Sequence, residues 1–254
     1  MSAPANPEPF FEIEALRQTL DGHEVLRGVS FNVPKGKTTV ILGGSGAGKS
    51  VLLKHLNGLM RPLSGTVKVK GIEISTMTER ALTPIRRQIG VLFQDGALFD
   101  SMTVGENVAF PLRETGVRDE ALIAHRVDEV LALVGLKGQN RKMPDVLSGG
   151  MRKRVSLARA IVGKPESLLY DEPTAGLDPI LSESITRLIA KLKDELHLTS
   201  VVVTHNLGAM RFVADQVIFL KHGEVHFAGP PSGIDASDDP AIREFIHADA
   251  MGRD

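Results

Sequence analysis

The residues with the clearest chemical pattern form a glycine-rich loop in the first quarter of the chain. They are Gly43, Gly44, Ser45, Gly46, Ala47, Gly48, Lys49 and Ser50. This run fits the G-x-x-x-x-G-K-[ST] pattern of a phosphate-binding P-loop. Glycines let the backbone wrap around a phosphate with its N–H groups pointing inward, and a following helix presents its positive N-terminal end to the same anion. The pattern predicts that Lys49 reaches the β- and γ-phosphates of a nucleotide and that Ser50 is a ligand of Mg²⁺.

A pair of carboxylates supplies the second part of a phosphate-transfer site. Asp171 and Glu172 come directly after the apolar residues 168–170, as at the end of a strand. Beside a P-loop, Asp171 fits the carboxylate that helps Ser50 to hold Mg²⁺. Glu172 is expected on the opposite side of an extended strand, where its carboxylate would act as the general base for an attacking water.

Residues 147–151, Leu-Ser-Gly-Gly-Met, form a second glycine-containing motif before a helical pattern. Its candidate binding residues are Ser148, Gly149 and Gly150. A serine and two glycines at a helix N-terminus can bind an anion through free backbone N–H groups. In isolation the simpler interpretation of Ser148 is an N-cap, so this motif indicates a second phosphate site only in combination with the P-loop.

Short apolar runs alternate with helical patterns along the chain, which predicts an α/β protein with a largely parallel sheet. The candidate strands are residues 39–42, 89–93, 168–170 and 200–203. The helical patterns lie at residues 51–59, 119–134 and 151–162 and after Pro179. Asp119 is a candidate helix cap, and residues 222–223 are a candidate hairpin turn. The P-loop therefore lies between a strand and a helix, which is the context that its chemistry requires.

The composition excludes several classes of protein. The chain has 254 residues, with 30 Lys+Arg against 31 Asp+Glu and no cysteine. A net charge of -1 gives no field for holding a polyanion, so no nucleic-acid partner is expected. Without cysteine there is no disulfide, cysteine-ligated zinc or iron–sulfur cluster. Residues 1–9 do not resemble a secretory signal, and no apolar run approaches the roughly 20 residues of a membrane helix, so we expect a cytoplasmic protein with peripheral membrane association.

Five motifs taken together resemble the nucleotide-binding domain of ABC transporters over residues 10–230. They are the P-loop, residues 147–151, Asp171-Glu172-Pro173, residues 175–178 and Val203-Thr204-His205. The resemblance implies an α/β P-loop NTPase fold of the RecA-like kind, with an N-terminal antiparallel β part and an inserted α-helical subdomain. On this basis we expect a core of residues 8–93 and 163–230, a helical subdomain of residues 94–162 and a C-terminal tail of residues 231–254.

The resemblance also implies roles for single residues. Gln94 would contact the nucleotide and Mg²⁺, Asp178 would be the D-loop aspartate and one of the nucleotide-binding residues, and His205 would contact the γ-phosphate. The implied catalytic residues are Lys49, Glu172 and His205. The residues implied to contact ATP on a second copy of the chain are Ser148, Gly149 and Gly150. ATP and Mg²⁺ would then be held in a head-to-tail pair of copies.

One stretch narrows the resemblance to a class of ABC ATPases. Residues 93–104 and 106–113, together with Met151 after the glycine pair, look like the ATPase subunits of Mla/Mce-type lipid transporters. The class implies an MlaE-type permease, an Mce-domain lipid-binding subunit and, in some systems, a STAS-domain subunit as partners. It also implies a peripheral position on the cytoplasmic side of the bacterial inner membrane. The alternatives are the ATPase of another importer, for amino acids or ions, and a soluble ABC ATPase such as an iron–sulfur assembly scaffold.

Two positions depart from the common ABC pattern, and the tail lies outside it. Leu20 stands where many members stack an aromatic residue on adenine, so we expect only apolar contact there. Gly44 stands where proline is frequent, which leaves the loop backbone less restricted. The tail carries an apolar stripe of Ile242, Phe245 and Ile246. The stripe would pack on the same chain or on a second copy, and packing on the same chain is favoured because terminal helices often pack locally.

Overall fold

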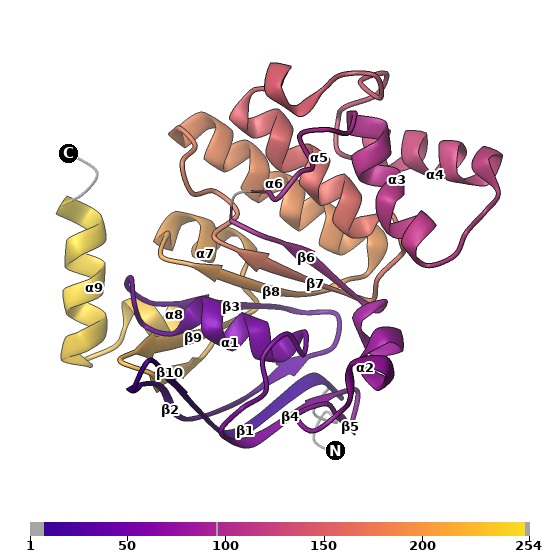
Figure 1. The fold of residues 1–254 in the computed structure, drawn as a ribbon. Coiled ribbons are helices and arrows are strands. Elements are labelled where there is room, and N and C mark those ends of the chain that lie inside the picture. The colour runs from indigo at the N-terminus through magenta and orange to yellow at the C-terminus, as the bar shows by residue number, and fades with distance from the viewer. Residues whose placement is uncertain (1–7, 95, 252–254) are drawn as a thin grey trace, which may run out of the picture.

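Two sheets form the framework of the chain (Figure 1). The computed structural model describes residues 8–94 and 96–251. The antiparallel sheet has the order β2-β1-β4-β5, and its strands are β1 (Pro9–Leu20), β2 (His23–Pro34), β4 (Ser64–Val69) and β5 (Ile72–Glu73). The six-stranded sheet has the order β10-β9-β3-β8-β7-β6, and its strands are β3 (Thr38–Leu42), β6 (Ile89–Leu92), β7 (Ser167–Asp171), β8 (Thr199–Thr204), β9 (Gln216–Lys221) and β10 (Glu224–Gly229). Only β10 is antiparallel to its neighbour in this second sheet, so the predicted parallel sheet is confirmed.

Helices cover the six-stranded sheet on both faces (Figure 1). The side of the antiparallel sheet carries α1 (Lys49–Leu56) and α2 (Glu79–Arg86). The other side carries α3 (Val104–Glu114), α4 (Glu120–Leu133), a short 3-10 helix (Pro144–Val146), α5 (Gly149–Ile161), α6 (Pro179–Leu196) and α7 (Leu207–Val213). After β10 come α8 (Pro231–Asp235) and α9 (Pro240–Met251). Across residues 8–94 and 96–251, no helix has the length and apolar character needed to span a bilayer.

The central strands enter two separate hydrophobic clusters. In β3, Val40 and Leu42 belong to the cluster shared with α5 and α6, whereas Ile41 belongs to the cluster shared with α1 and the antiparallel sheet. This alternation follows because successive side chains of a strand point to opposite faces. Both faces of the six-stranded sheet are covered, which explains why the sequences of its central strands are continuous apolar runs.

The loops that carry the motifs leave the same edge of the six-stranded sheet. Leu42 of β3 pairs with Thr204 of β8, and Val203 of β8 pairs with Asp171 of β7. Because these strands are parallel neighbours, their carboxyl ends lie side by side, where ligands of open α/β sheets usually bind. The P-loop follows β3, Asp171 ends β7 and His205 follows β8. The strand order therefore assembles segments that are far apart in the sequence.

Side-chain caps set the starts of the helices around the motifs. Asp119 accepts hydrogen bonds from two backbone N–H groups of α4, which confirms the predicted cap. Thr103 and Glu106 form a capping box at the start of α3. Ser148 caps α5, and Asp178 caps α6. A side-chain cap of this kind stabilises the start of a helix by about 1 kcal/mol, so these residues help to define where the four helices begin.

Helix α1 is shorter than its apolar spacing predicts. The pattern suggested a helix through residue 59, but α1 ends at Leu56, and Leu59 is exposed. Gly58 has a φ of +68°, and its N–H donates to the carbonyl oxygen of His55 at 3.1 Å. A glycine in the left-handed conformation commonly ends a helix in this way.

The turn predicted at residues 222–223 joins β9 to β10 and packs on the antiparallel sheet. His222 and Gly223 have φ values of +50° and +79°, and a two-residue hairpin turn with both central residues left-handed is a common type. The backbone N–H of Arg27 in β2 donates to the carbonyl oxygen of Gly223 at 2.9 Å. The hairpin is therefore confirmed, and its turn links the two sheets.

Replacement of Gly223 by alanine is expected to lower the free energy of unfolding by about 1–3 kcal/mol. The new Cβ would lie 2.4 Å from the carbonyl oxygen of Val25, at a left-handed position. Gly36→Ala is the matched control, because Gly36 has a φ of +71° but a Cβ there would meet no atom within 4 Å. Urea denaturation measures both variants. Equal losses of stability would show that the contact with Val25 has no influence.

The C-terminal segment packs on its own chain, as expected from its apolar stripe. Ile242 is buried, and the ring of Phe245 meets the ring of Phe219 edge-on with 5.3 Å between centroids. Ile246 is partly buried against the same cluster. These contacts place α9 beside α8 and β10 at one end of the molecule (Figure 1). Residues 252–254 of the tail lie outside the described residues.

Candidate nucleotide-binding site

The P-loop wraps around the N-terminus of α1. Gly48 precedes the helix with a φ of +99°, and a Cβ there would lie 2.9 Å from both Leu26 Cδ2 and the carbonyl oxygen of Val25. Gly44 and Gly46 differ, because a Cβ on either would meet no atom within 4 Å. Both line an open cavity. Open space beside free backbone N–H groups at a helix start suits a phosphate group.

Lys49 is held inside the loop by oxygen atoms. Its side chain is 8% exposed, and Nζ lies 3.5 Å from Oε1 of Glu172. Nζ also donates to the carbonyl oxygens of Gly43 and Gly44 at 2.8 and 2.9 Å. Gly43 does not itself line the cavity, so it acts through Lys49. The ammonium group is thus placed at the centre of the loop, where phosphate oxygens can replace the two carbonyl oxygens.

Ser50 and Asp171 meet at the other side of the loop. The Ser50 hydroxyl donates to Oδ1 of Asp171 at 2.9 Å. Burial raises the pKa of Asp171, and the hydrogen bond from Ser50 opposes that rise. Within the described parts of the chain, no cluster of three His, Cys, Asp or Glu residues could hold a metal alone. The two oxygen ligands instead fit Mg²⁺, which usually takes one or two protein ligands together with substrate phosphates and water.

Glu172 does not continue β7, so its expected place on an extended strand is wrong. The strand ends at Asp171, and Glu172 has a φ of +43°. Its N–H donates to the carbonyl oxygen of Val203 at 2.9 Å, while its own carbonyl accepts from the N–H of Ala175 at 3.1 Å. The backbone therefore turns at this residue. A left-handed residue other than glycine costs about 1–3 kcal/mol, and such positions cluster at active sites.

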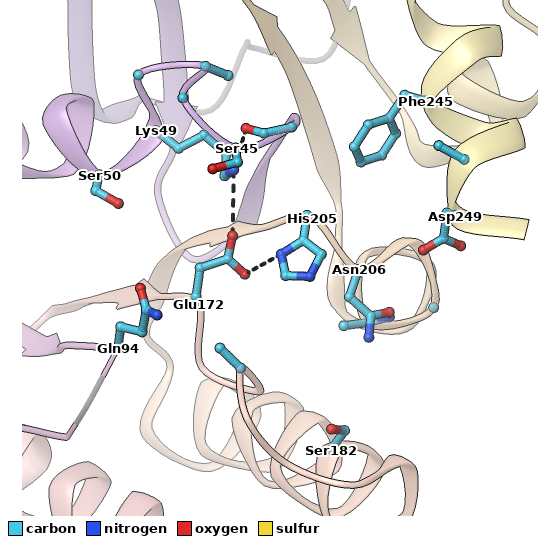
Figure 2. Close-up of a pocket in the computed structure, with 18 of the residues that line it drawn as sticks. Ser45, Lys49, Ser50, Gln94, Glu172, Ser182, His205, Asn206, Phe245 and Asp249 are labelled. Atoms are coloured by element: carbon cyan, nitrogen blue, oxygen red, sulfur yellow. Dashed lines mark hydrogen bonds and ion pairs between the residues drawn. The ribbon is translucent and has the colours of Figure 1, made fainter. Parts of the chain in front are cut away.

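Glu172 joins the P-loop lysine to His205 (Figure 2). Its Oε1 lies 3.5 Å from Lys49 Nζ, and its Oε2 lies 3.0 Å from His205 Nδ1. The side chain of Glu172 is 12% exposed, whereas that of His205 is 63% exposed. A carboxylate held between a cation and an imidazole can accept a proton from a water molecule at the phosphate end of the cavity.

One cavity of about 1710 Å³ collects most of the expected site residues. Those that line it are Gly44, Ser45, Gly46, Ala47, Gly48, Lys49, Ser50, Gln94, Glu172 and His205. Leu20 and Val25 line it as well, so Leu20 is placed to give the expected apolar contact. Residues at or just after the carboxyl ends of β1, β3, β6, β7 and β8 therefore contribute to a single site.

Six of the expected residues do not line the cavity of their own chain. Gly43 and Asp171 contact the cavity residues Lys49 and Ser50, and the other four are Ser148, Gly149, Gly150 and Asp178. The Ser148 hydroxyl accepts a hydrogen bond from the N–H of Met151 at 3.3 Å. Asp178 accepts one from the N–H of Leu181 at 2.9 Å, and a Cβ on Gly150 would lie 3.2 Å from the Leu181 side chain. In a single copy these residues cap and pack helices.

Gln94 connects the cavity to the helix that begins with the 148–150 motif. Its side chain is exposed at the cavity wall. Its backbone carbonyl accepts a short hydrogen bond from Nζ of Lys153 in α5. The next residue, Asp95, lies outside the described residues. A residue of the cavity wall is therefore hydrogen-bonded to α5.

The cavity also contains residues that the sequence patterns did not indicate. Those from α6 and α7 and the turn before α7 include Pro179, Ser182, Glu183, Thr186, Asn206 and Phe212. Helix α9 adds Phe245, Ala248 and Asp249. In the sequence, Phe245 was noted only as part of an apolar stripe, and no pattern predicted a role for Asp249. Their place in the wall depends on where the tail packs.

The middle of the chain, residues 26–175, matches the family model described as ABC transporter. This match covers more than half of the 254 residues. The chain belongs to the ABC transporter family. It is an ABC ATPase subunit that hydrolyses ATP.

The relatives of this ABC ATPase include ATP-binding subunits of transporters. The "Probable ribonucleotide transport ATP-binding protein mkl" of Mycobacterium tuberculosis is 41% identical over 241 residues, which cover 95% of this chain and 67% of the relative. The "Methionine import ATP-binding protein MetN 1" of Acinetobacter baylyi is 43% identical over 225 residues, which cover 87% of this chain and 63% of the relative. This chain thus spans about two thirds of each relative.

Solved ABC cassettes share the fold. The dimeric cassette MJ0796 bound to ADP and Pi superposes with a TM-score of 0.79 at 33% identity, covering 87% of this chain and 98% of that one. The cbiO1 subunit from Clostridium perfringens, part of the cbiONQ transporter complex, gives a TM-score of 0.83 at 32% identity, covering 93% and 94%. The ABC ATPase fold is therefore confirmed.

Proposed function

We propose that this ABC ATPase holds ATP and Mg²⁺ between two head-to-tail copies and uses hydrolysis to drive a lipid-transporting permease. The observation that carries the hydrolytic part is the contact of Glu172 with Lys49 on one side and His205 on the other, inside the P-loop cavity. The transport part rests on the surface beside Gln94 and on the resemblance of residues 93–113 to lipid-transport ATPases.

The P-loop residues bind and orient the triphosphate. Backbone N–H groups around Gly46 receive phosphate oxygens, and Lys49 exchanges its two carbonyl partners for them. Ser50 and Asp171 are the Mg²⁺ ligands in this proposal, with Gln94 as a further ligand at the cavity wall. When bound, Mg²⁺ neutralises charge on the phosphates.

Glu172 and His205 act on the water and the γ-phosphate. In this structure the Glu172 carboxylate is paired with Lys49. Movement of the ammonium group toward phosphate oxygens leaves this carboxylate to orient a water and accept its proton. His205 stays beside Glu172, and its exposed ring is free to contact the γ-phosphate. Lys49 and His205 then stabilise charge on the transferred group.

A second copy completes the site. Ser148, Gly149 and Gly150 lie outside the cavity of their own chain. Ser148 is exposed and Gly149 is half-buried, so this motif can meet the nucleotide of a partner copy, whereas Gly150 is buried. Asp178 likewise does not line the cavity of its own chain. Two of the matched structures, both of the cassette MJ0796, are dimeric, which supports this arrangement.

An exposed aromatic surface beside Gln94 supports a permease partner. Phe93 and Phe99 are each 40% exposed. The rings of Phe99 and Phe110 lie 4.8 Å apart, and the Arg159 guanidinium stacks 5.8 Å from the Phe99 ring. Exposed apolar patches of this kind mark protein contacts. We therefore place the MlaE-type permease here, with the Mce-domain subunit beyond it and the ATPase on the cytoplasmic side of the inner membrane.

An amino-acid importer is the second candidate, and the methionine-import relative at 43% identity favours it. Both candidates use the same catalytic residues and differ in the permease. Purification of the tagged chain from native membranes in mild detergent, followed by mass spectrometry, separates them. An MlaE-type permease with an Mce-domain protein and phospholipid supports lipid transport. An amino-acid permease supports the alternative, and no membrane partner contradicts both.

Substitution of Phe99 by serine is expected to reduce the recovery of the permease at least about tenfold, because burial of one aromatic ring at an interface stabilises it by more than about 1.4 kcal/mol. ATP binding by the purified subunit should not change. Leu63→Ser is the matched control, since Leu63 is 70% exposed at the start of β4, away from the helical layer. Equal recovery of the permease by both variants would place the interface elsewhere.

A further inference from the structure

The hairpin of β1 and β2 forms one wall of the nucleotide cavity, although it carries none of the phosphate-binding motifs. Leu20, which ends β1, and Val25 of β2 both line the cavity. The hairpin also lies against the P-loop, because a Cβ on Gly48 would be 2.9 Å from both Leu26 Cδ2 and the carbonyl oxygen of Val25. This wall therefore starts directly beside the N-terminus of α1.

An irregular pairing of the two strands sets the position of Val25. Gln18 pairs with Leu26 and Thr19 pairs with Glu24, so in the register of these two fully described strands Val25 is opposite no residue of β1. An extra residue of this kind is a β-bulge, which bends its strand and can redirect a side chain. The bulge explains why Val25 is half-buried in the cavity wall, between an exposed Glu24 and a buried Leu26.

The direction of the triphosphate places the base on the hairpin side of the cavity. In a P-loop the backbone at the helix start holds the α- and β-phosphates, and the lysine reaches the β- and γ-phosphates. Glu172 and His205, which act on the γ-phosphate in the proposed function, follow β7 and β8 on one side of β3. The hairpin lies toward the other neighbour of β3, because the N–H of Arg27 donates at 2.9 Å to the carbonyl oxygen of Gly223, in the turn after β9. The ribose and base therefore extend from the P-loop toward the hairpin.

The polar side chains near this wall of the hairpin have partners outside the cavity. Oε1 of Gln18 lies 3.3 Å from Nε2 of the buried His55, and the Glu24 carboxylate pairs with the Arg17 guanidinium at 2.7 Å. Among the described residues of the hairpin, only its two aliphatic residues line the cavity. The hairpin therefore offers the base apolar contact and no side-chain hydrogen-bonding group.

We propose that the nucleotide site discriminates weakly between bases, so that it binds GTP, CTP and UTP nearly as well as ATP. This inference rests on the proposed nucleotide site. A site that hydrogen-bonds its ligand rejects an analogue without the matching group by about 10⁴-fold or more, whereas an apolar pocket distinguishes related ligands by about 10²-fold at most. Aliphatic side chains also lack the π-face on which an aromatic residue stacks a base. The triphosphate, held by Lys49 and the loop backbone, therefore supplies most of the affinity.

Displacement of N-methylanthraniloyl ATP from the full chain, without Mg²⁺ to prevent hydrolysis, tests this selectivity. The affinities of the unmodified protein for ATP, GTP, CTP and UTP are expected to lie within about tenfold of one another. Leu20→Tyr is expected to tighten the binding of ATP and GTP about three- to tenfold, and that of CTP and UTP less, because a purine stacks on an aromatic ring over a larger area. Inorganic tripolyphosphate, which has no base, should bind both proteins equally.

Ile72→Tyr is the matched control, a tyrosine in place of an aliphatic residue on the same antiparallel sheet. Ile72 is 48% exposed in β5 and does not line the cavity, so this substitution should change none of the five affinities. An equal gain in Ile72→Tyr and Leu20→Tyr would show that the new ring acts without contact to the base, which contradicts the inference.

Other outcomes also overturn it. A preference of the unmodified protein for ATP beyond the tenfold range would show that groups outside the hairpin select the base, and this result does not depend on the folding of any variant. A response of Leu20→Tyr that is equal for purine and pyrimidine nucleotides would place the base elsewhere in the cavity. Lys49→Ala separates the two levels: unchanged binding of all four nucleotides would refute the proposed nucleotide site itself, whereas weakened binding together with a strong preference for ATP in the unmodified protein would refute only the weak selectivity.

Discussion

Replacement of Glu172 by glutamine is expected to lower the ATP turnover rate by about 10²- to 10⁴-fold and to leave ATP binding intact. The amide can keep a hydrogen bond to His205, 3.0 Å from the carboxylate oxygen, but it cannot accept a proton from water. The charge lost beside Lys49 also removes a competitor for the ammonium group, so the affinity for ATP should not fall. Phosphate release and equilibrium binding of labelled ATP measure the two quantities separately.

Glu166→Gln is the matched control for this substitution. Glu166 directly precedes β7, whereas Glu172 follows it, and its carboxylate pairs with Lys70 on the surface at 2.8 Å. Exposed pairs of this kind contribute about 0–1 kcal/mol to stability, so turnover should be unchanged. Near-normal hydrolysis by Glu172→Gln would remove Glu172 from the role of general base, and loss of ATP binding would show that it is needed to hold the loop.

Substitution of Ser148 by arginine is expected to reduce hydrolysis by about 10²-fold or more without weakening ATP binding to a single copy. Ser148 lies outside the cavity of its own chain, so only a site shared between copies loses a contact. In the Glu172→Gln background, ATP should produce a dimer by light scattering. The double variant, which also carries Ser148→Arg, should bind ATP and remain a single copy.

Thr78→Arg controls for the loss of a helix cap. Thr78 caps α2 as Ser148 caps α5, so both substitutions remove a cap worth about 1 kcal/mol. Helix α2 lies on the opposite side of the six-stranded sheet, and this control should hydrolyse ATP normally. ATP-dependent dimers of the Ser148→Arg double variant would contradict the head-to-tail arrangement. So would a loss of single-copy binding, because it would place Ser148 in its own cavity.

The P-loop and the metal pair were predictable because their pattern is local. The glycines, Lys49 and Ser50 are consecutive, and their effect depends on one strand, one turn and one helix start. The position of Asp171 at the end of a strand was predicted from the apolar run before it. In the structure its Oδ1 accepts a hydrogen bond from the Ser50 hydroxyl at 2.9 Å. The helix caps at Asp119 and Ser148 also follow from neighbouring residues, since a cap acts within one turn.

Two features differed from the prediction, the first because of a contact between distant segments and the second because of a nearby glycine. Glu172 was expected to be extended, but a hydrogen bond to Val203 in β8 and the turn to Ala175 give it a left-handed backbone. Helix α1 was expected to be longer, but Gly58 ends it. The first difference arises in the pairing of two strands, which a single segment of sequence does not specify.

The amino-acid types and their spacing were therefore sufficient to predict an α/β ATPase with a P-loop, which is confirmed, and to propose its reacting groups. Chain geometry over a few residues determines a P-loop, a cap or a buried strand, so these can be read directly. The three-dimensional arrangement alone established that Glu172 bridges Lys49 and His205, that the 148–150 motif lies outside its own cavity, and that Asp249 lies in the cavity wall. These relations arise from strand order and helix packing, which depend on burial of apolar faces across the whole chain.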